Sequence, residues 1–135
     1  MAEHSSHLAF VERAYDDTYA LLVAMRDYVA GPSSDDAQTL EPGDRLILTH
    51  QLSRVTRLLT NVMAWLMVQK AVAAGELTSE EGASEPAAEL DFLGDADEDL
   101  EELGRLPLAA RSLIDRARRI AALVRQLDGA ASLPQ

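Results

Sequence analysis

Apolar residues recur at steps of three and four over three long segments of this chain, and nowhere do they alternate as the residues of a strand would. Such spacing lays one apolar stripe along one side of a helix, so each segment predicts an amphipathic helix. Ala14, Leu21 and Tyr28 widen the first stripe, and Leu58, Trp65 and Val72 flank the second. The stripe residues are Leu8, Val11, Tyr15, Thr18, Leu22, Met25 and Val29 in the first segment, Leu48, Leu52, Val55, Leu59, Val62, Leu66, Gln69 and Ala73 in the second, and Leu106, Ala110, Leu113, Ala117, Ile120, Val124 and Leu127 in the third.

Capping and breaking residues set the ends of these helices. The signals are Ser5 or Ser6, Gly31-Pro32, Asp44, Gly75, Pro107 and Gly129. They predict helices over about 6–30, 44–74 and 107–128, with a polar loop at 31–43 and a connection at 75–105. Three helices that each carry one stripe bury it together. We therefore predict a single helical domain over residues 1–135, all-α, built as a three-helix up-down-up bundle with a long acidic connection between the second and third helices.

Negative charge is concentrated in that connection. The net charge is −11, yet residues 75–104 hold twelve acids and no base, so the rest of the chain is close to neutral. A chain of this charge is repelled by phosphate backbones, which argues against a nucleic-acid partner. Thr78 with Glu81, and Asp95 with Glu98, have the spacing of capping boxes for short helical turns. The segment is either a solvated linker or an acidic arm that docks on a basic surface, its own or a partner's.

The third predicted helix supplies a candidate basic face. Arg111, Arg118 and Arg125 lie seven residues apart, so they align, and Arg119 stands beside them. This face is either solvated or a docking site for the acidic arm or an acidic partner. The sequence predicts surface ions at Arg54 and Arg57 of the second helix.

The second predicted helix is apolar on every side over residues 62–68. If Val62 faces the core, then Ala64, Met67 and Val68 point outward and Met63 lies at the edge of the same patch. Phe10 and Val23 of the first helix also point outward and can extend the patch. Such a patch is covered either by the connection, through Leu90, Phe92 and Leu93, or by a dimer or partner interface, for which methionine-rich surfaces are well suited.

Several chemistries find no support in these residues. The chain has no cysteine, and His4, His7 and His50 form no Glu-x-x-His pair, so we expect no metal site. There is no phosphate-binding glycine loop and no nucleophile elbow, so we expect neither a cofactor nor catalytic residues, and the chain is predicted not to be an enzyme. No run approaches the roughly 20 apolar residues of a membrane helix, and no signal peptide begins the chain; a cytoplasmic location is expected.

The second predicted helix carries a family resemblance. Residues 53–59 (SRVTRLL), 64–72 (AWLMVQKAV) and 75–78 (GELT) resemble the RcdA-like family, alphaproteobacterial proteins named for the regulator of CtrA degradation. The resemblance implies a three-helix bundle that forms homodimers. It also implies an adaptor for the ClpXP protease that delivers cell-cycle transcription regulators as cargo and is held to the ClpX-type unfoldase through a response-regulator primer.

Two functions are consistent with this sequence. The first is a non-catalytic protein-binding adaptor that promotes regulated proteolysis of cell-cycle regulators by ClpXP, as the resemblance implies. The alternative is a structural homodimeric scaffold with no role in protease delivery. The resemblance also implies a flexible C-terminal tail that matters for delivery, whereas this sequence stops at Gln135, a few residues beyond the third predicted helix.

Overall fold

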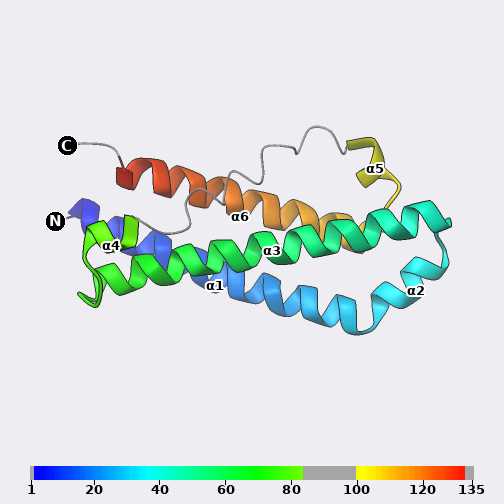
Figure 1. Ribbon diagram of the computed structural model, residues 1–135, viewed down its shortest axis with the longest axis horizontal. Coiled ribbons are helices and arrows are strands. Elements are labelled where there is room, and N and C mark those ends of the chain that lie inside the picture. The colour runs from blue at the N-terminus through cyan, green and yellow to red at the C-terminus, as the bar shows by residue number, and fades with distance from the viewer. Residues whose placement is uncertain (1, 84–99, 133–135) are drawn as a thin grey trace.

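Three long helices pack side by side in the computed structural model, which describes residues 2–83 and 100–132 (Figure 1). They are α1 (Ala2–Ala30), α3 (Pro42–Ala73) and α6 (Leu108–Ser132), and each contacts both of the others. Three short helices accompany them: α2 (Pro32–Gln38), α4 (Ser79–Ala83) and α5 (Leu100–Gly104). The all-α bundle that the apolar spacing predicts is confirmed. None of the helices in the described ranges has the length and apolar character needed to cross a membrane.

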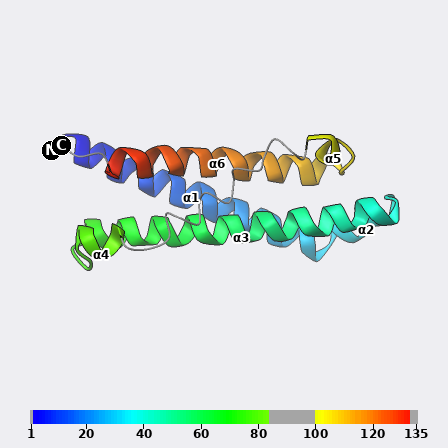
Figure 2. The ribbon, with the colours of Figure 1, turned by 45° about the horizontal axis from the view of Figure 1, so that its top comes forward.

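The direction of α6 is different from the prediction. It runs parallel to α3, and both are antiparallel to α1, so the up-down-up order is wrong (Figures 1 and 2). Residue pairs near both ends of α3 show this: Asp44 meets Arg105 just before α6, and Trp65 meets Asp128 near its end. A short turn after α3 would force an antiparallel neighbour, but more than thirty residues separate the two helices. At about 3.3 Å per extended residue, this connection is long enough to return along the whole bundle.

The segment between α1 and α3 also differs from the prediction. Residues 32–38 form the helix α2 where the sequence predicts a polar loop. Pro32 occupies the first turn, where its fixed φ favours a helix. The Tyr28 hydroxyl donates a 2.7 Å hydrogen bond to Asp36 Oδ2, and Ala37 packs on the core. These tertiary contacts stabilise a turn that the local sequence, rich in Ser and Asp, does not favour.

The start of α3 lies two residues before the predicted cap. The helix begins at Pro42, with Glu41 at the N-cap position and no side-chain cap. Asp44 therefore lies inside the first turn, where its charge favours the helix N-terminus, and its carboxylate pairs with Arg105 at 3.5 Å.

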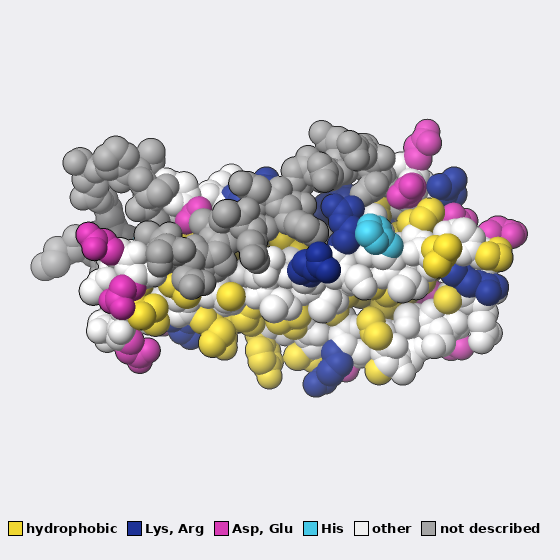
Figure 3. All heavy atoms as spheres, in the orientation of Figure 1, with side chains coloured by type: hydrophobic (Ala, Val, Ile, Leu, Met, Phe, Trp, Pro, Cys, Tyr) yellow, Lys and Arg dark blue, Asp and Glu magenta, His cyan; other side chains and the backbone are white. Residues whose placement is uncertain are grey.

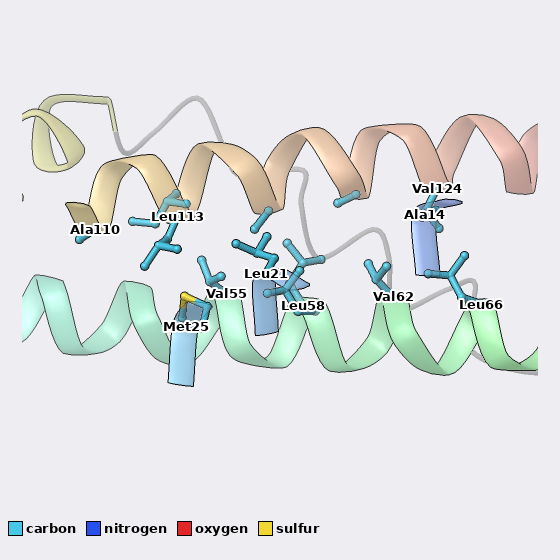
Figure 4. Packing of buried hydrophobic residues seen from close by; sticks show 14 of the residues in the cluster. Ala14, Leu21, Met25, Val55, Leu58, Val62, Leu66, Ala110, Leu113 and Val124 are labelled. Atoms are coloured by element: carbon cyan, nitrogen blue, oxygen red, sulfur yellow. The ribbon is translucent and has the colours of Figure 1, made fainter. Parts of the chain in front are cut away.

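The core runs along the axis between the three long helices (Figure 4). The buried side of α1 is turned from the predicted stripe toward Ala14, Leu21 and Tyr28, while Val29 is half-exposed. In α6, the core positions Ala110, Ala117 and Ala121 are fully buried, so α6 presents small side chains to its neighbours. Figure 4 shows Ala14, Leu66 and Val124, one from each long helix, converging on the same layer.

Two polar side chains are buried within the core. The Thr18 hydroxyl donates a 2.7 Å hydrogen bond to the carbonyl oxygen of Ala14, so it needs no partner across the bundle. Gln51 is buried on α3, one turn before Val55, whereas Gln69, which the stripe places in the core, is half-buried. The buried side-chain amide of α3 is therefore that of Gln51, in the first half of the helix.

Candidate protein-binding surfaces

An aromatic and methionine surface lies along the groove between α1 and α3. The Nζ of Lys70 on α3 lies 4.1 Å from the centroid of the Tyr15 ring on α1, and this contact shows which sides of the two helices meet. Met63 and Met67 precede Lys70 by seven and three residues, so they lie on the same side of α3. Tyr19 follows Tyr15 by one turn. We call these five residues the α1/α3 surface.

Large apolar area is exposed on the α1/α3 surface. The exposed fractions of Tyr19 and Met67 are 58% and 56%. Tyr15 and Met63 are half-buried, so they form the floor from which these two side chains project. Figure 3 shows hydrophobic side chains gathered along this part of the molecule, over α1 and α3. Contiguous exposed apolar area of this kind is typical of a protein-binding site.

The structure brings together some of the predicted patch residues and separates others. Met63 and Met67 lie together, and Val23 lies one turn after Tyr19 and is half-buried. Ala64 is exposed on the outer side of α3. Val68 follows Trp65 by three residues and so lies toward α6, because Trp65 bonds to Asp128. Phe10, half-exposed, precedes Tyr15 by five residues, which puts it on the other side of α1.

The sequence analysis missed Tyr19 and Lys70 as members of this surface. Tyr15, Tyr19 and Val23 are spaced by four residues, a signal for one exposed row on a helix. The apolar spacing places Tyr15 in the core stripe, whereas the buried side of α1 is turned away from this residue. Only the packing of α1 against α3 shows that this row faces the methionines.

A second surface forms where α3 and α6 run in parallel. Arg54 precedes Trp65 by eleven residues, three helical turns, so it lies on the side of α3 that faces α6. On α6, Asp128 bonds to Trp65 of α3 and follows Arg125 by three residues, so Arg125 lies toward α3, as do Arg118 and Arg111 at steps of seven. We call these four arginines, with His50 one turn before Arg54, the α3/α6 basic groove. They are half-buried except for the exposed Arg125 and His50.

Two further arginines lie outside the groove. Arg119 is exposed and follows the fully buried Ala117 by two residues, so it points away from the bundle, although the sequence grouped it with the other three. Arg57 lines a depression of about 580 Å³ between α1, α2 and α3, whose apolar lining includes Val29, Leu48 and Leu52. Arg57 therefore lies on the side of α3 toward α1 and α2, outside the groove.

The predicted capping box at the start of α4 is present. The backbone N–H of Thr78 donates to Glu81 Oε1 at 3.0 Å, and the N–H of Glu81 donates to Thr78 Oγ1 at 3.1 Å. The backbone hydrogen bond from Thr78, followed by the side-chain bond, lowers the pKa of Glu81. The second predicted box, Asp95 with Glu98, lies outside the described residues, as do Leu90, Phe92 and Leu93. Cover of the apolar patch by the connection therefore stays a prediction.

We searched the described part of the chain for clusters of metal-ligating side chains. Within residues 2–83 and 100–132, no three His, Cys, Asp or Glu side chains form a group that could hold a metal ion. The two surfaces offer apolar contact, cation–π contact and charge-assisted hydrogen bonding.

The fold and these surfaces define a small helical bundle with two candidate interfaces along its helix–helix grooves. The chain belongs to the family described as a protein of unknown function, DUF1465, whose model matches residues 2–135. It is also similar to the crystal structure of RcdA from Caulobacter crescentus CB15, with a TM-score of 0.76, 25% sequence identity and 93% of each chain covered. The resemblance to the RcdA-like family is thereby confirmed. No curated protein sequence matches the chain.

Proposed function

We propose that this protein is a non-catalytic adaptor that binds other proteins through the α1/α3 surface and promotes regulated proteolysis by ClpXP. The observation that carries the proposal is the exposure of Met67 and Tyr19 on one continuous surface, in a chain that is similar to RcdA over 93% of its length. The cargo would be a cell-cycle regulator, as the family resemblance implies.

The chemistry of the α1/α3 surface supports a binding role. Methionine side chains are unbranched and polarizable, so they adapt to partners of different shape. Tyrosine supplies apolar area with few rotatable bonds, and interfaces are enriched in it. The ammonium group of Lys70 over the Tyr15 ring orients that ring and adds a positive charge beside the apolar area. A partner helix or loop with apolar anchors would bury Met67 and Tyr19 together.

The proposal is tested by protein capture followed by a degradation assay. The tagged chain is used to capture partners from a native lysate, and mass spectrometry identifies them. A captured regulator is then labelled, and its degradation by purified ClpXP is followed with and without the chain. We expect the chain to accelerate degradation. Recovery of the chain alone, without unfoldase, primer or regulator, would contradict the adaptor function and favour the homodimeric scaffold.

A matched pair of variants localises the activity. Met67→Glu places a charge in the α1/α3 surface, and we expect it to reduce the acceleration at least fivefold while helix content is retained. Leu46→Glu is the control, because Leu46 is even more exposed but lies at the other end of α3. Equal loss in both variants, or in neither, would rule out the α1/α3 surface as the binding site.

A further inference from the structure

Charge is segregated among the helices of this bundle. Together α3 and α6 contain nine Lys and Arg residues and three Asp and Glu residues, while α1 and α2 together contain two and seven. Beyond Asp44, α3 has no acidic residue at all. Two of the three acids are engaged at the ends of the α3–α6 contact, Asp44 with Arg105 and Asp128 with Trp65. The third, Asp115, is exposed and lies one helical turn from both Arg111 and Arg118, so the α3/α6 basic groove carries an excess of positive charge with one carboxylate at its edge.

The groove has a regular geometry. Arg111, Arg118 and Arg125 repeat every seven residues, which is about 10 Å along α6. The pairs Asp44–Arg105 and Trp65–Asp128 set α3 and α6 in register, so that His50 lies level with Arg111, and Arg54 lies between the levels of Arg111 and Arg118. Figure 3 shows Lys and Arg side chains beside a histidine where these two helices run together.

The α3/α6 basic groove contains a buried hydrogen-bond donor on Arg111. The Nε of Arg111 is buried and has no hydrogen-bond acceptor among the described residues. A buried N–H of a guanidinium is normally satisfied, and a carboxylate is its preferred acceptor because the planar groups match. The groove thus has both the charge and an unused donor for a carboxylate ligand.

We propose that the α3/α6 basic groove binds an acidic peptide segment of a partner protein, whose carboxylates pair with the four arginines of the groove. An extended peptide advances about 3.3 Å per residue, so one acid in every three residues would meet successive arginines of α6. The site is separate from the α1/α3 surface, on the other side of α3. The inference rests on the proposed function only in taking the occupant from a partner protein.

Fluorescence anisotropy tests the proposal on the full chain. The probe is a labelled twelve-residue peptide with Glu at every third position, and its Gln counterpart is the negative control. We expect the Glu peptide to bind at low salt and to lose affinity several-fold at physiological ionic strength, because exposed charges are screened. The Gln peptide should not bind. Equal binding of both peptides, or of neither, would overturn the proposal.

Variants on one helix localise the binding. Arg118→Gln with Arg125→Gln should lower the affinity about tenfold, since each ion pair at the protein surface contributes up to about 1 kcal/mol. Arg116→Gln with Arg119→Gln removes the same charge from exposed positions outside the groove and should change the affinity less than twofold. Arg54→Gln should also weaken binding, because the groove includes α3. Circular dichroism checks the fold, and the single variant Arg125→Gln, at an exposed position, serves if the double variant unfolds.

Three outcomes would assign the groove differently. Equal weakening by both double variants would indicate attraction to the whole chain rather than to the groove. Tighter binding of single-stranded DNA of matched charge would make the partner a nucleic acid. Peptide binding that occurs only after the acids of residues 84–99 are replaced by amides would identify the chain's own segment as the occupant. Peptide binding without stimulation of ClpXP would leave this inference standing and contradict only the proposed function.

Discussion

The indole Nε1 of Trp65 donates a hydrogen bond to Oδ1 of Asp128 across 3.1 Å, joining the later parts of α3 and α6. The Trp65 side chain is 2% exposed, so its N–H has little access to water and depends on this carboxylate. The bond also fixes the relative position of two parallel helices whose connecting segment is long. It therefore contributes to the register on which the α3/α6 basic groove depends.

We predict that Asp128→Ala lowers the free energy of unfolding by about 1–2 kcal/mol, because it leaves the buried indole N–H without an acceptor. Asp128→Asn should cost less, since its side-chain oxygen can still accept the bond. Urea denaturation measures both. Asp115→Ala, at an exposed position of the same helix, is the control and should change the stability by less than about 0.5 kcal/mol. Equal effects of Asp128→Ala and Asp115→Ala would show that the hydrogen bond is not stabilising.

The small core residues of α6 lead to a second prediction. Ala121 is fully buried, whereas its neighbour Ala122 is exposed. Ala121→Leu should destabilise the bundle by about 1–3 kcal/mol, because a larger side chain forces α6 away from its neighbours. Ala122→Leu has the same change in helix propensity and should be nearly neutral. Thermal unfolding of the two variants gives the comparison, and a neutral Ala121→Leu would mean that α6 packs more loosely than the structure shows.

The helices could be predicted from the sequence because their apolar residues repeat at helical spacing, and because Gly31, Gly75 and Pro107 lie at or next to their ends. The direction of α6 could not, because a stripe such as Leu113, Ala117 and Val124 packs equally well in either direction. The pairs Trp65–Asp128 and Asp44–Arg105, which the sequence does not reveal, show the direction.

The same limit applies to the candidate surfaces. The row Arg111, Arg118 and Arg125 follows from its spacing alone, but its proximity to Arg54 depends on the parallel order of α3 and α6. An antiparallel α6 would have placed Arg125, not Arg111, level with the first half of α3. In a similar way, the exposed row of Tyr15 and Tyr19 is visible in the sequence, while its meeting with Lys70 is a property of the packed helices.

The capping box of α4 gives a third prediction. The pKa of Glu81 is lowered by hydrogen bonds from Thr78, so the bonded carboxylate supports the box at neutral pH. The contribution of the ionised Glu81 side chain to the stability of the capping box is present above the ordinary carboxyl pKa. It is lost as the pH falls through the lowered pKa of Glu81. Thr78→Ala removes one bond of the box and should raise the pKa of Glu81 toward its ordinary value, whereas Thr78→Ser should not. Titration of the Glu81 side chain by NMR distinguishes them; equal pKa values in the Ala and Ser variants would contradict the box.

The hydrogen bond from Tyr28 to Asp36 makes the attachment of α2 dependent on pH. Burial, followed by the hydrogen bond and the negative charge of Asp36, raises the pKa of Tyr28 well above its ordinary value of 10.0. The pKa of Tyr28 is higher in the folded chain than in the unfolded chain. The contribution of the hydrogen bond to the free energy of unfolding is therefore complete below pH 10 and is lost as the pH rises toward the folded-state pKa. Tyr28→Phe should lower the free energy of unfolding by about 1 kcal/mol at pH 7.

The difference between the wild type and Tyr28→Phe should narrow as the pH rises above about 10, because the unfolded wild-type chain then releases the Tyr28 proton and the folded chain does not. Urea denaturation at a series of pH values from about 8 to 11 measures this difference. Tyr19→Phe is the control, because Tyr19 is exposed and its variant should remain close to the wild type throughout. A Tyr28→Phe difference that stays constant over this range would show that the Tyr28 hydroxyl is as accessible to water as that of an unfolded tyrosine.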